Sequence, residues 1–238
     1  MNKIRLFVDH TLGEAQSVPL NKDQAHYIFS VMRKSIGETI LIFDGNNGEW
    51  EASIEEISKK SGVLFCIKQT KPQIMPPDLW LFFCPLKKVR TDFIVEKATE
   101  LGVARIIPVQ TEHTNVDRIK LSRLSAHAIE AAEQCGGTYI PKIEELQKIN
   151  EVLENFPPDR KLLFCDEKLQ SSEVNFKNLK KGKWAILVGP EGGFSEIERN
   201  YLKGLKFTFS ISLGPRILRA DTAAVTAISL WQNYLGDW

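Results

Sequence analysis

The chain has 238 residues, of which 43% are hydrophobic and 26% charged, which suits one large globular domain or two modest ones. Its formal net charge is +1, which excludes a polyanionic partner that is bound through overall charge. Any surface for nucleic acid must therefore be a local basic patch.

The four cysteines form no CxxC pair, which argues against a zinc site and against a disulfide framework. Cys66, Cys84 and Cys165 stand within or beside apolar runs, so we expect them to be buried, reduced thiols. The opening residues contain no apolar signal core, and no apolar run approaches the roughly 18 residues of a membrane span. We therefore expect a soluble, cytoplasmic protein that binds no metal and no membrane.

Short strands around one helix predict a small β-barrel module in the first 72 residues. Lys3–Val8, Thr39–Phe43 and Val63–Ile67 are expected strands, and Trp50–Ile54 alternates as half-buried strands do. Lys71–Asp78 contains three prolines, which exclude a helix or a central strand. We take it as a linker and expect domains at residues 1–72 and 73–238.

The helix of the first module should begin at a capping box. Asn21 can accept hydrogen bonds from the first helical amides, and Gln24 has the spacing to return a hydrogen bond to Asn21. Apolar residues at helical spacing predict a buried face made of Ala25, Ile28, Val31 and Met32.

After the linker, strands and helices alternate, which predicts an α/β domain with a mainly parallel sheet and helices on both faces. The expected strands are Leu79–Cys84, Arg105–Val109, Lys161–Cys165, Trp184–Val188 and Phe207–Leu213. The expected helices are Thr91–Leu101, Arg118–Gln134, Glu144–Asn155, a short one capped by Ser195 and Glu198, and a last one starting at Asp221 or Thr222. A polar loop is expected over Lys168–Lys183.

Two glycine-containing turns, Gly189–Phe194 and Gly214–Ala223, each lie between an expected strand and an expected helix. Ligands of open α/β sheets bind at the carboxyl ends of the strands, and glycine lets the backbone come close to a ligand. Neither turn has the spacing of a dinucleotide fingerprint or a P-loop. Each turn is equally consistent with a tight connection, but two such turns, one carrying Arg216 and Arg219, favour a ligand site.

The residues of both turns resemble a known family. Leu187–Ser195 together with Leu213–Ala223 closely resembles the small-subunit rRNA uracil-N3 methyltransferases, the RsmE family of the SPOUT superfamily. The resemblance covers nearly the whole chain. Arg5–Val8, His26, Val31–Arg33 and Phe43–Gly45 resemble the family's PUA-like RNA-binding barrel, and Lys97–Val103 and Ala131–Gly136 resemble its methyltransferase helices. It implies a C-terminal trefoil knot, which strand and helix patterns alone do not predict.

The resemblance implies S-adenosylmethionine (SAM) as the methyl donor, with no metal, and a homodimer that acts on 16S rRNA of the small ribosomal subunit. The implied cofactor-binding residues belong to three strand ends and their turns. They are Leu163, Phe164, Leu187, Val188, Gly189, Pro190, Glu191, Gly192, Leu213, Gly214, Arg216, Ile217, Leu218, Thr222 and Ala223.

The implied chemistry removes the N3 proton of uracil, and a positioned arginine would stabilise the developing negative charge. Arg219 is the first candidate for that role and Arg216 the second. Glu191 and Asp221 are candidate proton acceptors, although Asp221 could equally be a helix N-cap. The implied RNA-binding residues are Arg5, His26, Arg33, Lys87, Lys88 and Arg90, of which the last three could equally be a solvated surface.

Two positions depart from the family. Gly137 stands where the family usually has arginine, and Asp221 stands where it often has glutamate. The first departure puts one contact with rRNA or substrate in doubt. Two alternative functions stay open: a SPOUT methyltransferase that acts on another RNA or on a ribose 2′-hydroxyl, and a non-catalytic RNA-binding protein.

Overall fold

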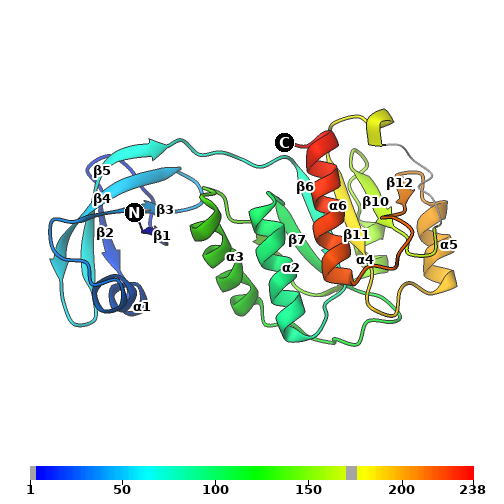
Figure 1. Ribbon diagram of the computed structural model, residues 1–238, viewed down its shortest axis with the longest axis horizontal. Coiled ribbons are helices and arrows are strands. Elements are labelled where there is room, and N and C mark those ends of the chain that lie inside the picture. The colour runs from blue at the N-terminus through cyan, green and yellow to red at the C-terminus, as the bar shows by residue number, and fades with distance from the viewer. Residues whose placement is uncertain (1–3, 170–175) are drawn as a thin grey trace. The chain divides into compact units, whose positions relative to one another are not determined.

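The computed structural model describes residues 4–169 and 176–238 and divides into two compact units (Figure 1). Unit 1 is Met1–Met75 with Ala132–Ile140, and unit 2 is Pro76–Ala131 with Pro141–Trp238. We expected domains at residues 1–72 and 73–238, each formed by one continuous stretch of chain, whereas unit 1 also contains residues 132–140. Lys3, at the start of the first expected strand, and residues 170–175 of the expected polar loop lie outside the described residues.

Unit 1 contains a five-stranded sheet in the order β1-β3-β4-β5-β2. The strand β1 pairs with β3 in parallel, and the other neighbours are antiparallel. Its strands are β1 (Arg5–Phe7), β2 (Ser17–Leu20), β3 (Thr39–Phe43), β4 (Glu49–Ile57) and β5 (Gly62–Lys71). The sequence did not predict β2, which contains Pro19 and lies at an edge, where a missing N–H is tolerated.

Alternating apolar residues of these strands form the core of unit 1. Ile40, Ile42, Ala52, Ile54 and Leu64 are at most 1% exposed and pack together. Because side chains alternate between the faces of a strand, this single set fixes the register of the sheet.

The first helix begins as predicted and then widens. In α1 (Lys22–Ala25) the capping box of Asn21 and Gln24 is complete. The chain continues as a π-helix, η1 (His26–Val31), in which the Met32 amide donates to the Tyr27 carbonyl five residues earlier. The wider turn moves Val31 and Met32 off the expected buried face, and they are 57% and 40% exposed.

Unit 2 is an α/β layer structure, as predicted. Its strands are parallel to their neighbours, in the order β12-β10-β11-β6-β7-β8, and β9 also pairs with β7. They are β6 (Leu79–Phe83), β7 (Arg105–Gln110), β8 (Lys142–Ile143), β9 (Gln147–Lys148), β10 (Lys161–Cys165), β11 (Trp184–Val188) and β12 (Thr208–Ile211). A knotted path through this sheet stays a prediction.

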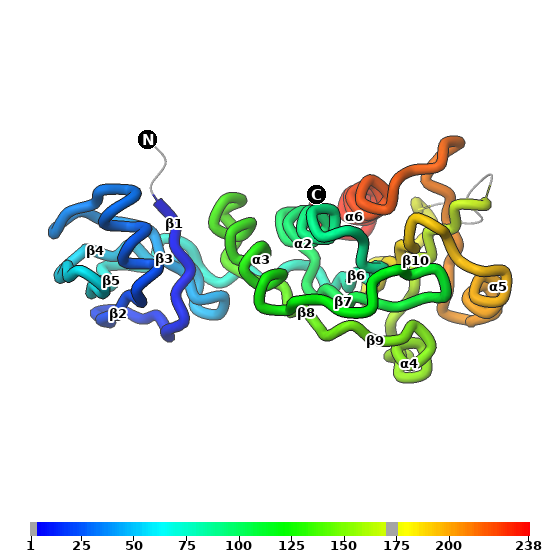
Figure 2. The backbone as a smooth tube through the Cα atoms, turned by 90° about the horizontal axis from the view of Figure 1, so that it is seen from below, coloured from blue at the N-terminus to red at the C-terminus, as the bar shows by residue number. Residues whose placement is uncertain are grey.

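Helices cover both faces of this sheet (Figure 2). The helices α2 (Lys88–Glu100) and α6 (Ala220–Leu235) lie together on one face, and α4 (Ile149–Glu154) and α5 (Glu196–Gly204) lie on the other. Residues of one strand face, including Phe82, Phe164 and Leu187, pack with residues of α4 and α5. The remaining elements are α3 (Leu121–Cys135) and the 3-10 turn η2 (Phe176–Asn178).

The first five residues of the helix expected over Glu144–Asn155 are not helical. Residues before Ile149 pair with the edge of β7 as β8 and β9, so that only Ile149–Glu154 is helical. A free sheet edge offers backbone partners that outweigh a short helical pattern. The last helix also starts earlier than expected, because its N-cap residue is Arg219 and Asp221 lies in its first turn.

Three of the cysteines are buried, as the sequence predicted, and Cys135 is exposed. Burial raises the pKa of Cys84 to about 11 and that of Cys165 to about 12, so both remain thiols at neutral pH. Within residues 4–169 and 176–238, no helix has both the length and the apolar composition to cross a membrane.

Candidate functional site

A cavity of about 570 Å³ opens in unit 2 where three adjacent strands end. It lies at the carboxyl ends of β10, β11 and β12, which is the usual position of ligands in open α/β sheets. The lining residues come from the loops after these strands and from the start of α2 and α6. They are Lys87, Arg90, Cys165, Asp166, Glu167, Val188, Gly189, Pro190, Glu191, Gly193, Ile211, Ser212, Leu213, Gly214, Arg216, Ile217, Leu218, Arg219, Ala220 and Ala223.

The first glycine turn is held by an aromatic side chain that follows it. A Cβ atom on Gly189 would lie 2.5 Å from the ring of Phe194, so only glycine leaves room for that ring. Phe194 is 3% exposed and packs edge-on against Phe164 of β10, with 5.0 Å between the ring centroids. The turn is therefore fixed to the core on the opposite face of the sheet.

The second turn is open. Gly214 has φ +115°, a conformation that other residues rarely adopt, and a Cβ atom there would meet nothing within 4 Å. In the described part of the chain, the backbone N–H and C=O groups of Leu213, Ile217 and Leu218 form no hydrogen bonds with protein groups. Polar backbone groups beside an apolar lining fit a ligand that has both polar edges and an apolar ring.

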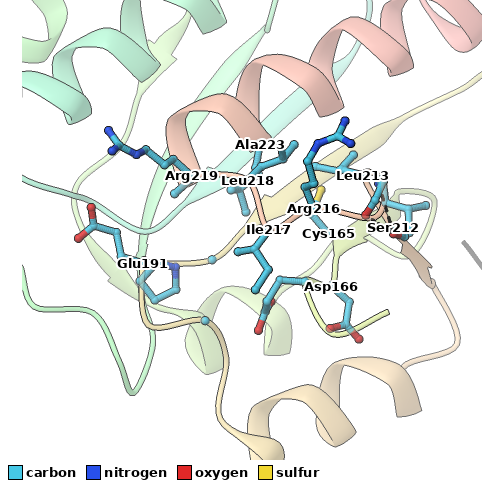
Figure 3. A pocket seen from close by; sticks show the side chains of 18 of the residues that line it. Cys165, Asp166, Glu191, Ser212, Leu213, Arg216, Ile217, Leu218, Arg219 and Ala223 are labelled. Carbon is cyan, nitrogen blue, oxygen red and sulfur yellow. Dashed lines mark hydrogen bonds between the residues drawn. The ribbon is translucent and has the colours of Figure 1, made fainter. Parts of the chain in front are cut away.

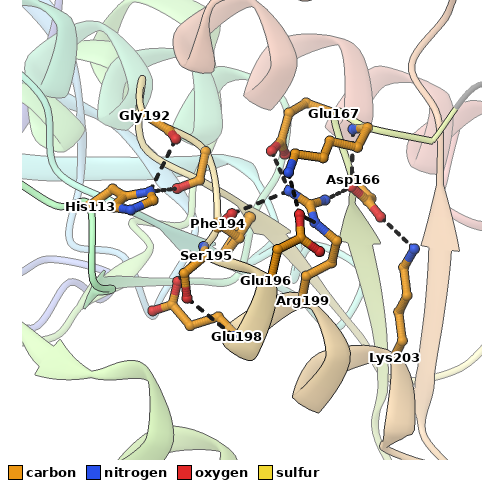
Figure 4. A network of polar contacts seen from close by, with 12 residues as sticks. His113, Asp166, Glu167, Gly192, Phe194, Ser195, Glu196, Glu198, Arg199 and Lys203 are labelled. Carbon is orange, nitrogen blue, oxygen red and sulfur yellow. Dashed lines mark hydrogen bonds and ion pairs between the residues drawn. The ribbon is translucent and has the colours of Figure 1, made fainter.

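The turn after β10 is held by a buried arginine from α5 (Figure 4). Arg199, 4% exposed, pairs with Asp166 and donates to Glu167 Oε1 at 2.7 Å. Lys203 Nζ lies 2.8 Å from the other oxygen of Asp166, whose side chain is fully buried. Burial lowers the pKa of Arg199. His113 adds a contact to the carbonyls of Gly192 and Gly193 at 3.1 and 3.2 Å.

A second arginine, Arg90, holds two carboxylates at the mouth of the cavity. Its Nε and Nη2 donate to the two oxygens of Asp221 at 2.9 and 2.7 Å, and its Nη1 pairs with Glu191. The hydrogen bonds from Arg90 lower the pKa of Asp221 and raise that of Arg90 itself. Asp221 is therefore a fixed anion that shares the mouth of the cavity with Glu191.

The two arginines of the second turn have no such partners. Within the described residues, the guanidinium groups of Arg216 and Arg219 form no hydrogen bond and no ion pair, and both side chains are exposed. Figure 3 shows Arg219 on the same side of the cavity as Glu191, and Arg216 beside Leu213. Their guanidinium groups are available to an anionic or electron-rich ligand.

The structure brings most of the predicted cofactor-binding residues to the cavity, together with three of the four predicted catalytic residues. Asp221 adjoins it through Arg90. Five of the predicted cofactor-binding residues do not line it. Leu163, Phe164 and Leu187 are fully buried within their strands, Gly192 packs against His113, and Thr222 faces solvent.

The predicted RNA-binding residues have several different environments. Arg5 is engaged inside unit 1, where it pairs with Glu49 at 2.6 Å and donates to the carbonyls of Ala132, Glu133 and Gly137. His26 and Arg33 are exposed on and just after η1 in unit 1. In unit 2, Lys88 is exposed, while Lys87 and Arg90 line the cavity.

Sequence reasoning missed several residues of the site. Glu167 lies two residues after Cys165, where the expected strand ends, so its place in the sequence could have marked it as a lining residue. Arg199 and His113 carry no sequence signal, because their partners are distant in the chain. Among the described residues, no three His, Cys, Asp or Glu side chains are grouped so that they could hold a metal ion.

Comparisons with known proteins agree with this architecture. Residues 74–232 match the family model of the RNA methyltransferase domain, and residues 20–64 match that of the RNA methyltransferase PUA domain. The fold and site thus define an RNA methyltransferase with an N-terminal PUA domain. A relative from Rickettsia conorii, ribosomal RNA small subunit methyltransferase E, is 32% identical over 94% of this chain and 93% of its own. The chain belongs to the ribosomal RNA small subunit methyltransferase E family.

Two solved structures are also similar over their full lengths. A Legionella pneumophila protein in complex with the bound cofactor SAM has a TM-score of 0.89 and 29% identity, with 100% of each chain covered. Ribosomal RNA small subunit methyltransferase E from Neisseria gonorrhoeae, bound to SAM, has a TM-score of 0.87 and 27% identity, again with 100% of each chain covered.

Proposed function

We propose that this protein transfers the methyl group of SAM to N3 of a uridine in 16S rRNA of the small ribosomal subunit. The observation that carries the proposal is the cavity between two glycine turns, at whose mouth the guanidinium groups of Arg216 and Arg219 have no partner among the described residues. Membership of the ribosomal RNA small subunit methyltransferase E family supports the choice of substrate.

The lining of the cavity suits SAM. Apolar surface for the adenine ring of SAM comes from Val188, Leu213, Ile217 and Leu218. The unpaired backbone groups of the second turn can form hydrogen bonds with the polar edge of that ring. Bound there, SAM would supply an electrophilic methyl group. Cys165 lines the cavity but is only 7% exposed, and burial keeps its pKa at about 12, so we assign it no nucleophilic role.

The chemistry at N3 requires loss of a weakly acidic proton and stabilisation of the negative charge that develops on the uracil ring. We assign charge stabilisation to Arg219, with Arg216 second, because both guanidinium groups are exposed at the cavity. We assign acceptance of the N3 proton to Glu191 in preference to Asp221. Both oxygens of Asp221 already accept from Arg90, whereas Glu191 is paired through Oε1 and keeps Oε2 for N3–H.

Reading a base edge in this way requires an unpaired uridine. For contacts to the RNA backbone we propose the exposed side chains of His26, Arg33, Lys87 and Lys88. Arg5 is left out, because its guanidinium group is fully engaged with Glu49 and the carbonyls of Ala132–Gly137. A substrate in the ribosomal subunit implies that the protein acts in the cytoplasm.

A homodimer is proposed only by analogy with the SPOUT superfamily. The apolar residues of α6 give it no independent support, because Ala224, Ile228 and Trp231 are buried within unit 2. Light scattering after size-exclusion chromatography tests this point: the mass of one 27.0 kDa chain at micromolar concentration would contradict it.

The central experiment incubates the protein with labelled SAM and either small ribosomal subunits or free 16S rRNA, followed by nucleoside analysis. N3-methyluridine is the expected product. A 2′-O-methylnucleoside without N3-methyluridine would show a different methyltransferase. Calorimetry with SAM and its demethylated product tests the alternative of a non-catalytic RNA-binding protein, which would bind neither compound.

A further inference from the structure

Arg90 connects three loops that are far apart in the sequence. It belongs to the first turn of α2, which follows β6, while its partners Glu191 and Asp221 follow β11 and β12. Its side chain is 21% exposed, and all three of its nitrogen atoms donate to these two carboxylates. Three of its five N–H donors are thus occupied, and two carboxylates offset its charge, so Arg90 is poorly suited to bind RNA phosphate.

The pair of Arg90 and Asp221 fixes the start of α6. The N-cap residue Arg219 gives that helix no side-chain hydrogen bond, so its first turn lacks the usual anchor. Asp221 supplies one instead, because its Oδ1 accepts from the Thr222 amide at 2.9 Å while both of its oxygens accept from Arg90. The preceding segment, Leu213–Leu218, has few protein hydrogen bonds that could fix the helix start.

The direction of Arg219 depends on this helix start, because Arg219 is the N-cap residue itself. Glu191 is held by the same guanidinium group through Oε1. Figure 3 shows that Arg219 and Glu191 extend on one side of the cavity. Arg219, which we propose stabilises the charge on uracil, and Glu191, which we propose accepts its proton, are therefore both held by Arg90.

We propose that Arg90 is a positioning residue, which fixes Arg219 through Asp221 and orients Glu191 directly. In this proposal Asp221 acts as an anchor and takes no proton. The effect on turnover rests on the proposed methyltransferase function, whereas the effect on the helix start does not.

The geometry requires arginine. A guanidinium group is a planar fork that can donate to both oxygens of one carboxylate and still reach a second carboxylate. The ammonium group of lysine keeps the charge but cannot form the fork. Arg90→Lys is therefore a matched test of geometry against charge.

A double-mutant cycle tests the proposal in the full-length protein. Arg90→Gln, which releases both Arg219 and Glu191, is expected to lower kcat about 30-fold, because small misplacements of catalytic groups can cost up to about 100-fold. Asp221→Asn releases Arg219 alone and should lower kcat about 10-fold. The double variant should lose about the same 30-fold as Arg90→Gln alone, since that change already breaks the contact that Asp221→Asn removes. Arg90→Lys should resemble Arg90→Gln, and the KM for SAM should change less than about twofold in all of them.

Three kinetic results would overturn the proposal. The first is a multiplied loss of about 300-fold in the double variant, which would mean that the two residues act independently. The second is full activity of Arg90→Lys. The third is a raised KM for ribosomal subunits with unchanged kcat, which would make Arg90 an RNA contact. Arg118→Ala, which removes an exposed arginine outside the cavity, is the matched control.

Hydrogen exchange tests the anchor without any assay of methylation. In Arg90→Gln the amides of residues 220–224 should exchange at least about tenfold faster, while those of β10 and β11 keep their protection. Unchanged exchange at the start of α6 would overturn the anchor even if the enzyme is active. Conversely, if the wild type forms no N3-methyluridine, the proposed function fails and this measurement still decides the role of Arg90.

Discussion

Two arginines hold the loops around the cavity, and they differ mainly in burial. Arg199, 4% exposed, holds the fully buried Asp166 on the α5 side, whereas Arg90, 21% exposed, holds Asp221 and Glu191 at the mouth. A charge pair taken out of water is costly to break, because the remaining partner stays buried and unpaired. A pair near solvent contributes little to stability. We therefore expect loss of the Arg199 pair to lower the stability of the fold, and loss of the Arg90 pair to lower the rate of turnover.

The largest expected effect is on the buried side. Arg199→Gln leaves Asp166 without its main partner and should lower the free energy of unfolding by about 3–5 kcal/mol. Lys203→Gln, which removes a 33%-exposed partner of the same carboxylate, should cost less than half as much. Urea unfolding of both variants measures the difference. An Arg199→Gln midpoint equal to that of the wild type would remove the contrast between the two arginines.

At the mouth the expected effect is on rate. Arg219→Ala removes the group that we assign to the developing charge and should lower kcat by about 10²- to 10³-fold. Binding of SAM in calorimetry and the urea midpoint should both stay as in the wild type, since the Arg219 side chain has no partner among the described residues. Arg118→Ala serves as the control. If Arg219→Ala turns over normally, Arg219 has no part in the mechanism.

The two glycine turns differ in the same way, because Gly189 packs against a buried ring and Gly214 lies in an open loop. Gly189→Ala forces a methyl group into the ring of Phe194 and should destabilise the protein by about 1–3 kcal/mol. Gly214→Ala meets no neighbouring atom, so its strain at φ +115° stays within an exposed loop and should weaken SAM binding more than folding. Thermal unfolding and calorimetry on both variants compare them. Equal losses of stability would contradict this division.

The smallest expected effect concerns pH. Arg90 lowers the pKa of Asp221 in the folded protein, so the anchor is fully present above the ordinary pKa of aspartate, about 3.9, and is lost as the pH falls through the lowered value. The stability difference between the wild type and Asp221→Asn should therefore stay constant from about pH 7 to pH 5 and shrink below about pH 4. Urea midpoints at several pH values provide the measurement. A difference that already shrinks between pH 7 and pH 5 would contradict it.

The sequence predicted elements whose signals are local. The ends of β3, β10 and β11 and both capping boxes follow from short apolar runs and from residues three positions apart. The turns after β11 and β12 were found for the same reason. Local patterns failed at η1, where one changed hydrogen-bond spacing moved Val31 and Met32 to the surface, and at β8 and β9, which exist because the edge of β7 is available.

Charged residues were harder to interpret than apolar ones, because a charge does not reveal its partner. Arg5 and Arg90 were both expected to bind RNA, yet Arg5 donates to three carbonyls, and Arg90 to two carboxylates, that lie more than 100 residues away along the chain. Arg199 was not singled out at all, although it is more buried than either of them. Composition and spacing record the presence of a cation, whereas its role depends on which carboxylates the fold brings to it.

The contacts of Arg5 have a consequence for how the protein could be cut or recombined. Its acceptors, the carbonyls of Ala132, Glu133 and Gly137, belong to unit 1, although the chain reaches them only after it has built part of unit 2. A cut after residue 72 would separate a nearly buried guanidinium group from three of its acceptors. Exchange of the N-terminal module between relatives should therefore succeed only when the stretch 132–140 is exchanged with it.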